Sequence, residues 1–183
     1  LLKFKGYSFP RMVEILFLAG DEGIFGFLTG ISSNILYIYI LFAGFMLSAG
    51  VGQFLIDFAV WAAGWARGGA AKIAVISSAL YGTVSGSTVA NVYATGSFTI
   101  PLMKRGGFIP KQAAAIEAIS STGGQLMPPI MGAGAFIMSE ITGIPYFKII
   151  QAAAIPAMLY YLGLFFVVHF ISMRQGMAAI PKA

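Results

Sequence analysis

Residues 24–49 contain no charged side chain, and an apolar run of this length leaves the chain few ways to fold. A helix of about 20 apolar residues spans the roughly 30 Å hydrocarbon core of a bilayer, and residues 24–49 exceed that length. Only 9% of all residues are charged, whereas soluble domains carry about 25%. We therefore expect an all-α integral membrane protein. A soluble protein with a large core is the less favoured alternative.

The composition also excludes several kinds of site. The sequence has no cysteine and a single histidine, His169, which excludes a disulfide framework and cysteine-ligated zinc. Because no nucleophile–base pair or metal triad can be assembled, a membrane enzyme is disfavoured. We interpret His169 as interfacial, since it ends an apolar run beside Arg174. The net charge of +5 does not indicate nucleic acid binding, because in membrane proteins the side on which basic residues lie matters more.

Charge and length divide the chain into segments. The first residue is not Met, and no signal-peptide cleavage site follows it, so we expect a fragment of a longer polypeptide. The expected segments, in order, are an extracytoplasmic segment with a short interfacial helix (1–23), a scaffold transmembrane helix (24–49), a cytoplasmic interfacial arm helix (50–70), a re-entrant hairpin (71–103), a discontinuous transmembrane helix (112–140), a transmembrane helix (145–172) and a cytoplasmic tail (173–183).

The arm helix is predicted from aromatic residues at nearly helical spacing, among them Phe54, Phe58, Trp61 and Trp65. This pattern favours an amphipathic helix that lies at the membrane interface with tryptophan anchors. The alternative is that the segment continues the preceding helix into water.

Segment 71–103 has the wrong length for a simple crossing. As one straight helix it would be about 50 Å long at 1.5 Å per residue, whereas two arms that fold near 85–90 would each be about 23 Å. The single straight helix would be longer than the bilayer core, and each of the two arms would be too short to cross it. Both flanks are basic, and basic residues gather on the cytoplasmic side. Only a re-entrant hairpin returns to the side from which it started.

The remaining charges support this topology in part. Seven of the eleven basic residues are expected inside: Arg67, Lys72, Lys104, Arg105, Lys111, Arg174 and Lys182. Four acids are expected outside: Glu14, Asp21, Glu22 and Glu140. The N-terminal residues Lys3, Lys5 and Arg11 fit this arrangement less well.

Segment 112–140 carries Gly123, Gly124, Pro128 and Pro129 near its middle. Two adjacent prolines lack N–H donors, and the second biases the first away from helical angles. We therefore predict a helix break at mid-membrane. Simple kinking by glycine and proline is the alternative.

The hairpin tip "SGSTVAN" and the break "SSTGGQLMPP" place non-helical backbone at membrane depth. Such backbone persists only when it is buried in protein or lines a wet cavity. Both segments enter from the same side, so we expect them to meet near the midplane. Helix C-terminal ends and unwound carbonyls attract a cation, and helix N-terminal ends attract an anion. Neutral side-chain oxygens at both places favour sodium: Ser85, Ser87, Thr88, Asn91, Ser121 and Thr122. The alternative for "SGS" alone is close helix packing.

Glu117 is the sole acid inside this span. An intramembrane acid suggests a functional site, but Glu117 is only six residues after Lys111. We favour an interfacial partner of Lys104, Arg105 or Lys111 over a proton relay.

The stretches "GTVSGSTVANVYATGSFTIPLMKR" and "EAISSTGGQLMPPIMGAGAFIM" resemble the large membrane subunit of TRAP (tripartite ATP-independent periplasmic) transporters. The pattern "STGGQ-MPP-MG" is similar to the TAXI branch, whose small and large membrane subunits are fused. The resemblance extends from about Gly6 to Ala179.

The resemblance implies half of an elevator-type transporter, with a re-entrant helical hairpin and a broken transmembrane helix. It implies a multi-pass permease in a bacterial or archaeal plasma (inner) membrane, which imports small organic anions with sodium. Its partners would be a periplasmic solute-binding protein, the lipid bilayer and the remaining membrane part of the permease, whose second hairpin this sequence lacks. The implied sodium-site residues are Ser85, Gly86, Ser87, Asn91, Ser121, Thr122, Gly123 and Gly124. The implied substrate-binding residues are Thr88, Asn91, Gln125, Pro128 and Pro129.

Two other transport mechanisms stay open. A divalent-anion/sodium symporter also has hairpins and broken helices, although the sequence motif Gly-Gly-Gln-Leu-Met-Pro-Pro argues against it. An ion channel with a re-entrant pore loop would need several symmetric copies of one motif around an axis, and the two motifs here differ.

Overall fold

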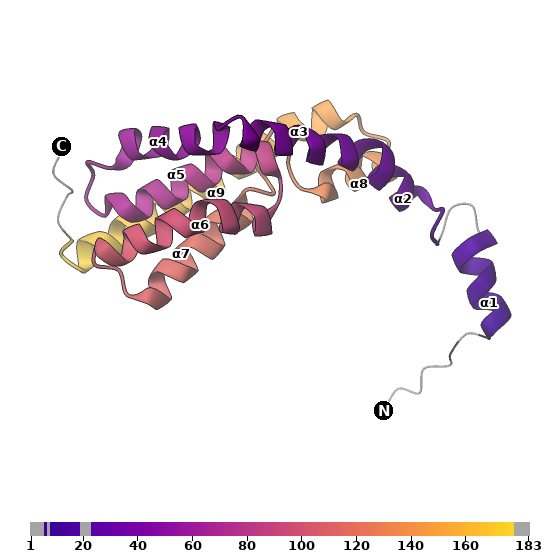
Figure 1. The fold of residues 1–183 in the computed structure, drawn as a ribbon, viewed down its shortest axis with the longest axis horizontal. Helices are drawn as coiled ribbons and strands as arrows, with labels where there is room; N and C mark the ends of the chain where they lie inside the picture. The colour runs from indigo at the N-terminus through magenta and orange to yellow at the C-terminus, as the bar shows by residue number, and fades with distance from the viewer. Residues whose placement is uncertain (1–5, 7, 19–22, 178–183) are drawn as a thin grey trace. The chain divides into compact units, whose positions relative to one another are not determined.

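The computed structural model describes residues 6, 8–18 and 23–177, and all regular elements within these residues are helical (Figure 1). The expectation of an all-α chain is confirmed for this part. The expected membrane sides of Lys3, Lys5, Asp21, Glu22 and Lys182 concern residues outside it. The chain forms two units, residues 1–41 and 42–183, with most of the structure in the second.

The first unit begins with α1 (Phe9–Val13), which continues into a π-helical turn η1 (Glu14–Leu18). Proline at the start of α1 suits a position whose N–H has no helical acceptor. The segment therefore contains a short helix where the sequence predicts one, while its placement at a membrane interface stays a prediction. The rest of the unit is α2 (Phe27–Ile31), η2 (Ser32–Leu36) and the start of α3 (Tyr37–Ser48).

In the described part of the chain, two helices are long and apolar enough to cross a membrane by length and composition, Thr29–Ser48 and Tyr146–Arg174. The first covers most of the expected scaffold helix 24–49, and the second covers the expected span 145–172. Gly50 ends α3 in the left-handed region at a φ of 87°, where glycine has no Cβ to clash. The next helix is therefore a separate element and does not extend α3 directly.

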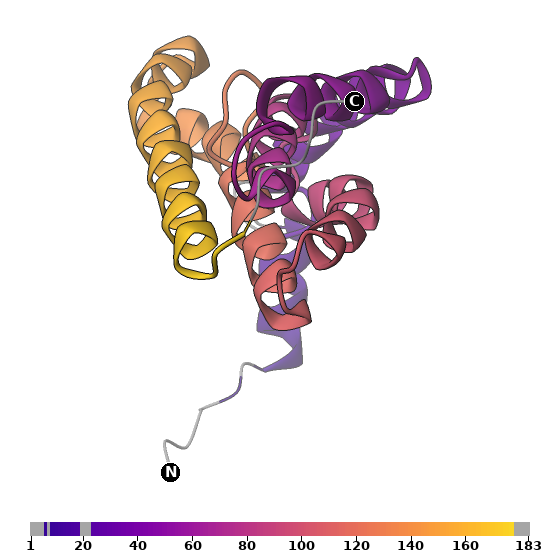
Figure 2. The ribbon, with the colours of Figure 1, turned by 90° about the vertical axis from the view of Figure 1, so that its left-hand side faces the viewer.

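The second unit is a bundle of six helices after the end of α3. They are α4 (Val51–Ala63), α5 (Gly69–Ser85), α6 (Thr88–Arg105), α7 (Pro110–Gly123), α8 (Ala133–Thr142) and α9 (Tyr146–Arg174). Helix α5 is central and contacts α4, α6, α7 and α9. Figure 2 shows α9, in yellow, along one side of the group.

Small residues on α5 allow this dense packing. Ala70, Ala71 and Ala74 are almost fully buried against α7 and α9, together with Met103 and Phe108. Small side chains let helix backbones approach closely, as is common between membrane helices. A second cluster joins α4 to α5 through Ala59, Ala63 and Ile73.

Helix α4 has two different faces. Ile56, Ala59 and Ala63 are buried, whereas Phe54 and Trp61 are 66% and 74% exposed. An outward aromatic face beside a buried small-residue face is the pattern expected of the interfacial arm. Its position at a membrane surface stays a prediction.

Candidate functional site

The chain reverses direction between α5 and α6, within the expected range 85–90. Gly86 has a φ of 58°, a value that favours glycine over L side chains. The Ser87 hydroxyl caps α6 by accepting from the Ala90 N–H at 3.3 Å. The Ser85 hydroxyl accepts from the Ser87 N–H at 3.5 Å. Both tip serines therefore already use their side chains to hold the turn.

The chain also leaves helical structure between α7 and α8. Turn-type backbone bonds continue from Gly124 to Met127, and the Gly132 N–H then closes the segment by donating to the Gln125 carbonyl at 2.8 Å. Met131 adopts a positive φ of 58°. Tyr146 at the start of α9 supports the segment from outside, because its hydroxyl donates to the Ile130 carbonyl at 2.5 Å. The interruption contains Gly124, Pro128 and Pro129, and its position at mid-membrane stays a prediction.

The turn and the interruption touch each other. A Cβ added at Gly82, one helical turn before the tip, would lie 2.4 Å from the Cα of Gly124. A Cβ added at Gly86 would lie 1.9 Å from the carbonyl oxygen of Met131. Real Cβ atoms essentially never approach another atom so closely. The backbones of the two segments are in direct contact, and glycine is required on the hairpin side of that contact.

Asn91 lies behind the turn and is completely buried. Its Nδ2 donates to the Ser78 carbonyl at 2.9 Å, and its Oδ1 lies 3.2 Å from the Thr95 hydroxyl oxygen. The amide therefore joins α5 to α6. A buried amide without this bond would cost free energy, so Asn91 has a structural role whatever else it binds.

The other predicted residues differ in their surroundings. Ser121 is buried and donates to Glu117, whereas Thr122 is exposed and donates to the Ala118 carbonyl at 2.8 Å. Gln125 and Pro129 are exposed, and Pro128 is half-buried. The hydroxyl oxygen of Thr88 is buried and has no hydrogen-bond partner among the described residues.

Helix α9 fixes the end of α7. The Tyr160 hydroxyl donates to the Ile119 carbonyl at 2.7 Å, and the Tyr161 hydroxyl donates to the Ser120 carbonyl at 2.8 Å. A Cβ at Gly123 would lie 2.4 Å from the Tyr160 ring. The last turn of α7 is therefore held by two tyrosines and by close packing.

A buried polar network extends from the turn along α6 to Glu117. Glu117 is 1% exposed. Its Oε1 accepts from Thr95 at 2.6 Å and from Ser121 at 3.2 Å, and its Oε2 accepts from Thr99 at 2.5 Å. In the described residues the carboxyl group makes no ion pair. The expected pairing with Lys104, Arg105 or Lys111 is therefore wrong.

The physical reason is the buried face of α7. Ala113, Ile116, Glu117, Ser120 and Ser121 follow one another at helical spacing and all point inward. Glu117 thus faces α6 and its threonines, while Lys111 is exposed at the start of the helix.

The site offers neutral oxygen atoms and helix ends. Within residues 8–18 and 23–177 there is no group of three or more His, Asp or Glu that could hold a metal ion. Transition metals prefer nitrogen and sulfur ligands, while carbonyl and hydroxyl oxygens suit harder cations. Chemically, the contact between turn and interruption is suited to a weakly held hard cation.

Comparison with known proteins decides the family. Residues 16–183 match the family described as "Tripartite ATP-independent periplasmic transporter, DctM component". The chain belongs to the DctM family of TRAP transporters. The resemblance to the large membrane subunit is therefore confirmed, while the TAXI branch and the fusion of subunits stay predictions.

Several curated proteins are similar to this DctM-family chain over 79% of its length. They include the C4-dicarboxylate TRAP transporter large permease protein DctM of Pseudomonas aeruginosa (33% identical), the uncharacterized protein y4mL of Sinorhizobium fredii (35%) and the sialic acid TRAP transporter large permease protein SiaM of Vibrio cholerae (27%). The matched region is 33–34% of the length of these relatives. The chain thus spans about a third of a large permease.

Sequence reasoning about this DctM-family chain missed Thr95, Thr99 and Ser78, which complete the buried network. A signal was present, because Asn91, Thr95 and Thr99 lie four residues apart and so share one face of a helix. A polar stripe of this kind on a buried helix requires a polar partner. Glu117 supplies that partner from α7, because its carboxyl group accepts from Thr95 and Thr99.

Proposed function

We propose that the chain is part of the permease of a sodium-coupled, binding-protein-dependent secondary importer of small organic anions. The contact between the α5–α6 turn and the α7–α8 interruption carries the proposal, because it brings a helix reversal and a helix interruption to one point. Membership of the DctM family supports the transporter class. The permease would be a multi-pass protein of a bacterial or archaeal plasma (inner) membrane.

Sodium would bind at the turn and the interruption. Helices α5 and α7 both end there, at Ser85 and Gly123, and the last carbonyls of a helix lack helical partners and carry partial negative charge. We assign the main ligand role to backbone carbonyls, because those of residues 121–124 each accept one N–H of the following turn and keep a second lone pair for a cation. The proposed ligand set lies within 85–91 and 121–124. Bound sodium would couple its gradient to solute movement.

The organic anion would bind on the other side of the same contact. Gly132 precedes α8 and offers no side-chain cap, so the first N–H groups of α8 are open to an anion. The buried hydroxyl of Thr88, which has no hydrogen-bond partner within the described ranges, also supports a polar ligand here. We propose Thr88, Asn91, Gln125, Pro128 and Pro129 as the surrounding residues. Relatives named for C4-dicarboxylate and sialic acid are consistent with a carboxylate substrate.

Transport by an elevator mechanism is part of the proposal. The α5–α6 hairpin would re-enter from the cytoplasmic side, and α7 and α8 would form one interrupted span beside it. Helix α4 would be the arm that connects this moving part to the scaffold. The partners would be a periplasmic solute-binding protein, a small membrane subunit fused as in the TAXI branch, and the permease half with the second hairpin.

The test is solute uptake into proteoliposomes that contain the complete permease and its binding protein. We expect saturable uptake of a carboxylate that stops when potassium replaces sodium or when the binding protein is left out. Uptake that is independent of sodium would refute the coupling. Single-channel currents would instead support a pore-loop channel.

A further inference from the structure

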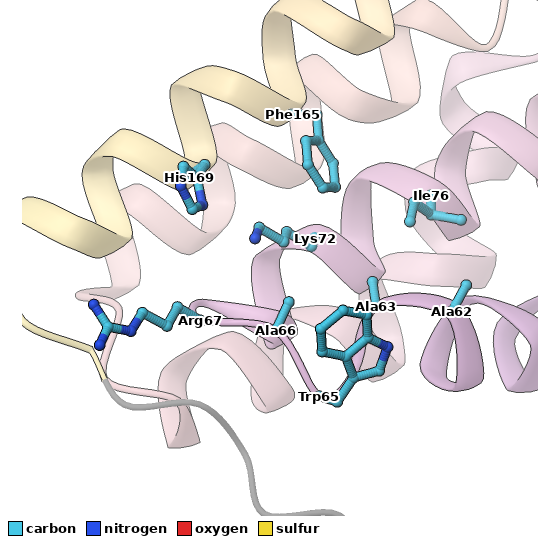
Figure 3. A pocket seen from close by; sticks show the side chains of 9 residues that line it. All are labelled: Ala62, Ala63, Trp65, Ala66, Arg67, Lys72, Ile76, Phe165 and His169. Atoms are coloured by element: carbon cyan, nitrogen blue, oxygen red, sulfur yellow. The ribbon is translucent and has the colours of Figure 1, made fainter.

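A pocket lies at the end of α5 that is opposite to the α5–α6 turn. It has a volume of about 460 Å³ and is formed by the end of α4, the α4–α5 connection, the first turn of α5 and α9. Figure 3 shows Arg67, Lys72 and His169 around it, with Phe165 and Trp65 in its walls. This end contributes nothing to the sodium or solute sites proposed above.

The pocket brings together nitrogen groups that have no acidic partner among the residues that the structure describes. Lys72 is 4% exposed, and its Nζ lies 5.0 Å from the centroid of the Phe165 ring. Nδ1 of His169 is buried and has no hydrogen-bond partner in the described residues. The ion pair found in those residues, Arg11–Glu14, lies elsewhere. A buried cation without a counter-charge is costly, so the pocket is suited to an anion.

The surroundings of the pocket are apolar. Besides Phe165 and Trp65, its walls consist mainly of alanine and isoleucine side chains. Large apolar residues are exposed on both flanking helices, Trp61 on α4 and Phe166 and Phe170 on α9. A ligand that fits here has an anionic group for the nitrogens and apolar chains for the flanks.

The shape of the pocket is fixed by the backbone. Gly68 has a φ of 66°, and a Cβ at this position would lie 1.9 Å from the Ser172 hydroxyl oxygen. The α4–α5 connection is therefore pressed against α9 one turn beyond His169. Arg67, Lys72 and His169 are held together by this contact although they come from different elements.

We propose that this pocket binds the phosphate group of an anionic phospholipid from the cytoplasmic leaflet. Arg67 and Lys72 attract the phosphate, and His169 as its Nδ1–H tautomer donates to a phosphate oxygen. The acyl chains lie along the exposed aromatic and aliphatic side chains of α4 and α9. Basic pockets between membrane helices on the cytoplasmic side bind anionic headgroups in this way.

The site joins the proposed arm helix to α9. A lipid held there would contact both elements and so tie the arm to the membrane surface. The proposal does not depend on sodium coupling, since it rests on the charges and walls of this pocket. The choice of leaflet rests on the cytoplasmic side proposed for Arg67 and Lys72.

The test uses the complete permease, purified in a zwitterionic detergent, and a fluorescent phosphatidylglycerol as probe. Unlabelled phosphatidylglycerol, phosphatidylcholine and inorganic phosphate compete in separate arms. We expect phosphatidylglycerol to displace the probe far better than the other two. Equal displacement by inorganic phosphate would show a free-phosphate site, and equal displacement by phosphatidylcholine would show a site without charge selection. Either result would overturn the proposal.

Three variants locate the site. Arg67→Gln and Lys72→Met should each weaken binding of the probe about fivefold, the effect of one basic residue near a lipid surface. The matched control is Arg105→Gln, because Arg105 is an exposed basic residue at the end of α6 that does not line the pocket. Arg67 is exposed, so its replacement should leave the fold intact. Wild-type binding in both pocket variants, or the same loss in the control, would refute the assignment.

Discussion

Replacement of Gly82 by alanine tests the contact between the turn and the interruption. The new Cβ would lie 2.4 Å from the Gly124 Cα, and ordinary van der Waals contact begins at 3.4 Å. Helices α5 and α7 must therefore separate by about 1 Å at this point, and such overpacking typically costs about 1–3 kcal/mol. Gly82 lies inside α5 and is not among the glycines with positive φ. The penalty is therefore steric and owes nothing to backbone strain.

The assay is thermal unfolding of the complete permease, followed by a sodium titration of solute uptake. We expect Gly82→Ala to lower the melting temperature and to weaken the apparent sodium affinity. Gly163→Ala is the matched control, since Gly163 lies inside α9 and a Cβ there would meet no atom within 4 Å. Alanine in an open helical position stabilises by about 0.5–1 kcal/mol. The contact would be refuted if Gly82→Ala behaved like this control in both measurements.

Three further changes test other parts of the account. Glu117→Gln keeps the shape of the buried side chain but replaces one acceptor oxygen by an NH2 group, so one of the hydroxyls of Thr95, Thr99 and Ser121 loses its acceptor. A buried polar group left without a partner costs about 1–3 kcal/mol, so the melting temperature should fall; an unchanged value would show that the network contributes little. Ser87→Ala removes the α6 cap, which costs about 0.5–2 kcal/mol. Ser87→Ala and Asn91→Ala, made separately, should each weaken the sodium dependence of uptake more than they weaken assembly of the permease. Unchanged sodium dependence in both variants would refute the place of these residues at the site. Cysteines that replace Arg67 and Lys104 should react with an impermeant reagent from the same face of oriented vesicles, and labelling from opposite faces would exclude the re-entrant hairpin.

The positions of the helix ends could be predicted because they depend on local chemistry. Segment 71–103 is too long for one crossing, and Gly86 within it permits the left-handed backbone of the turn. Gly124, Pro128 and Pro129 likewise disfavour a continuous helix at that point through their own backbone chemistry. The chain reverses direction at the first place and leaves helical structure at the second. The arrangement of these elements in a membrane depends on their surroundings, and it stays a prediction.

The environment of Glu117 could not be predicted in the same way. Its distance along the chain from Lys111 suggested an interfacial ion pair, but sequence distance does not show which face of a helix is covered. That depends on the packing of α7 against α5 and α6, which is a tertiary property. The spacing of Asn91, Thr95 and Thr99 indicated a polar face on α6, yet only the fold shows that the carboxyl group meets it.

The central claim is that the turn and the interruption together form a sodium site. Equilibrium binding of radioactive sodium to the purified complete permease tests it most directly, in the wild type and in Gly124→Ala. A Cβ at Gly124 would lie 2.8 Å from the Asn91 Nδ2, so the account predicts saturable binding in the wild type and loss of one sodium in the folded variant. The same number of bound sodium ions in both proteins, with the same affinity, would contradict the account.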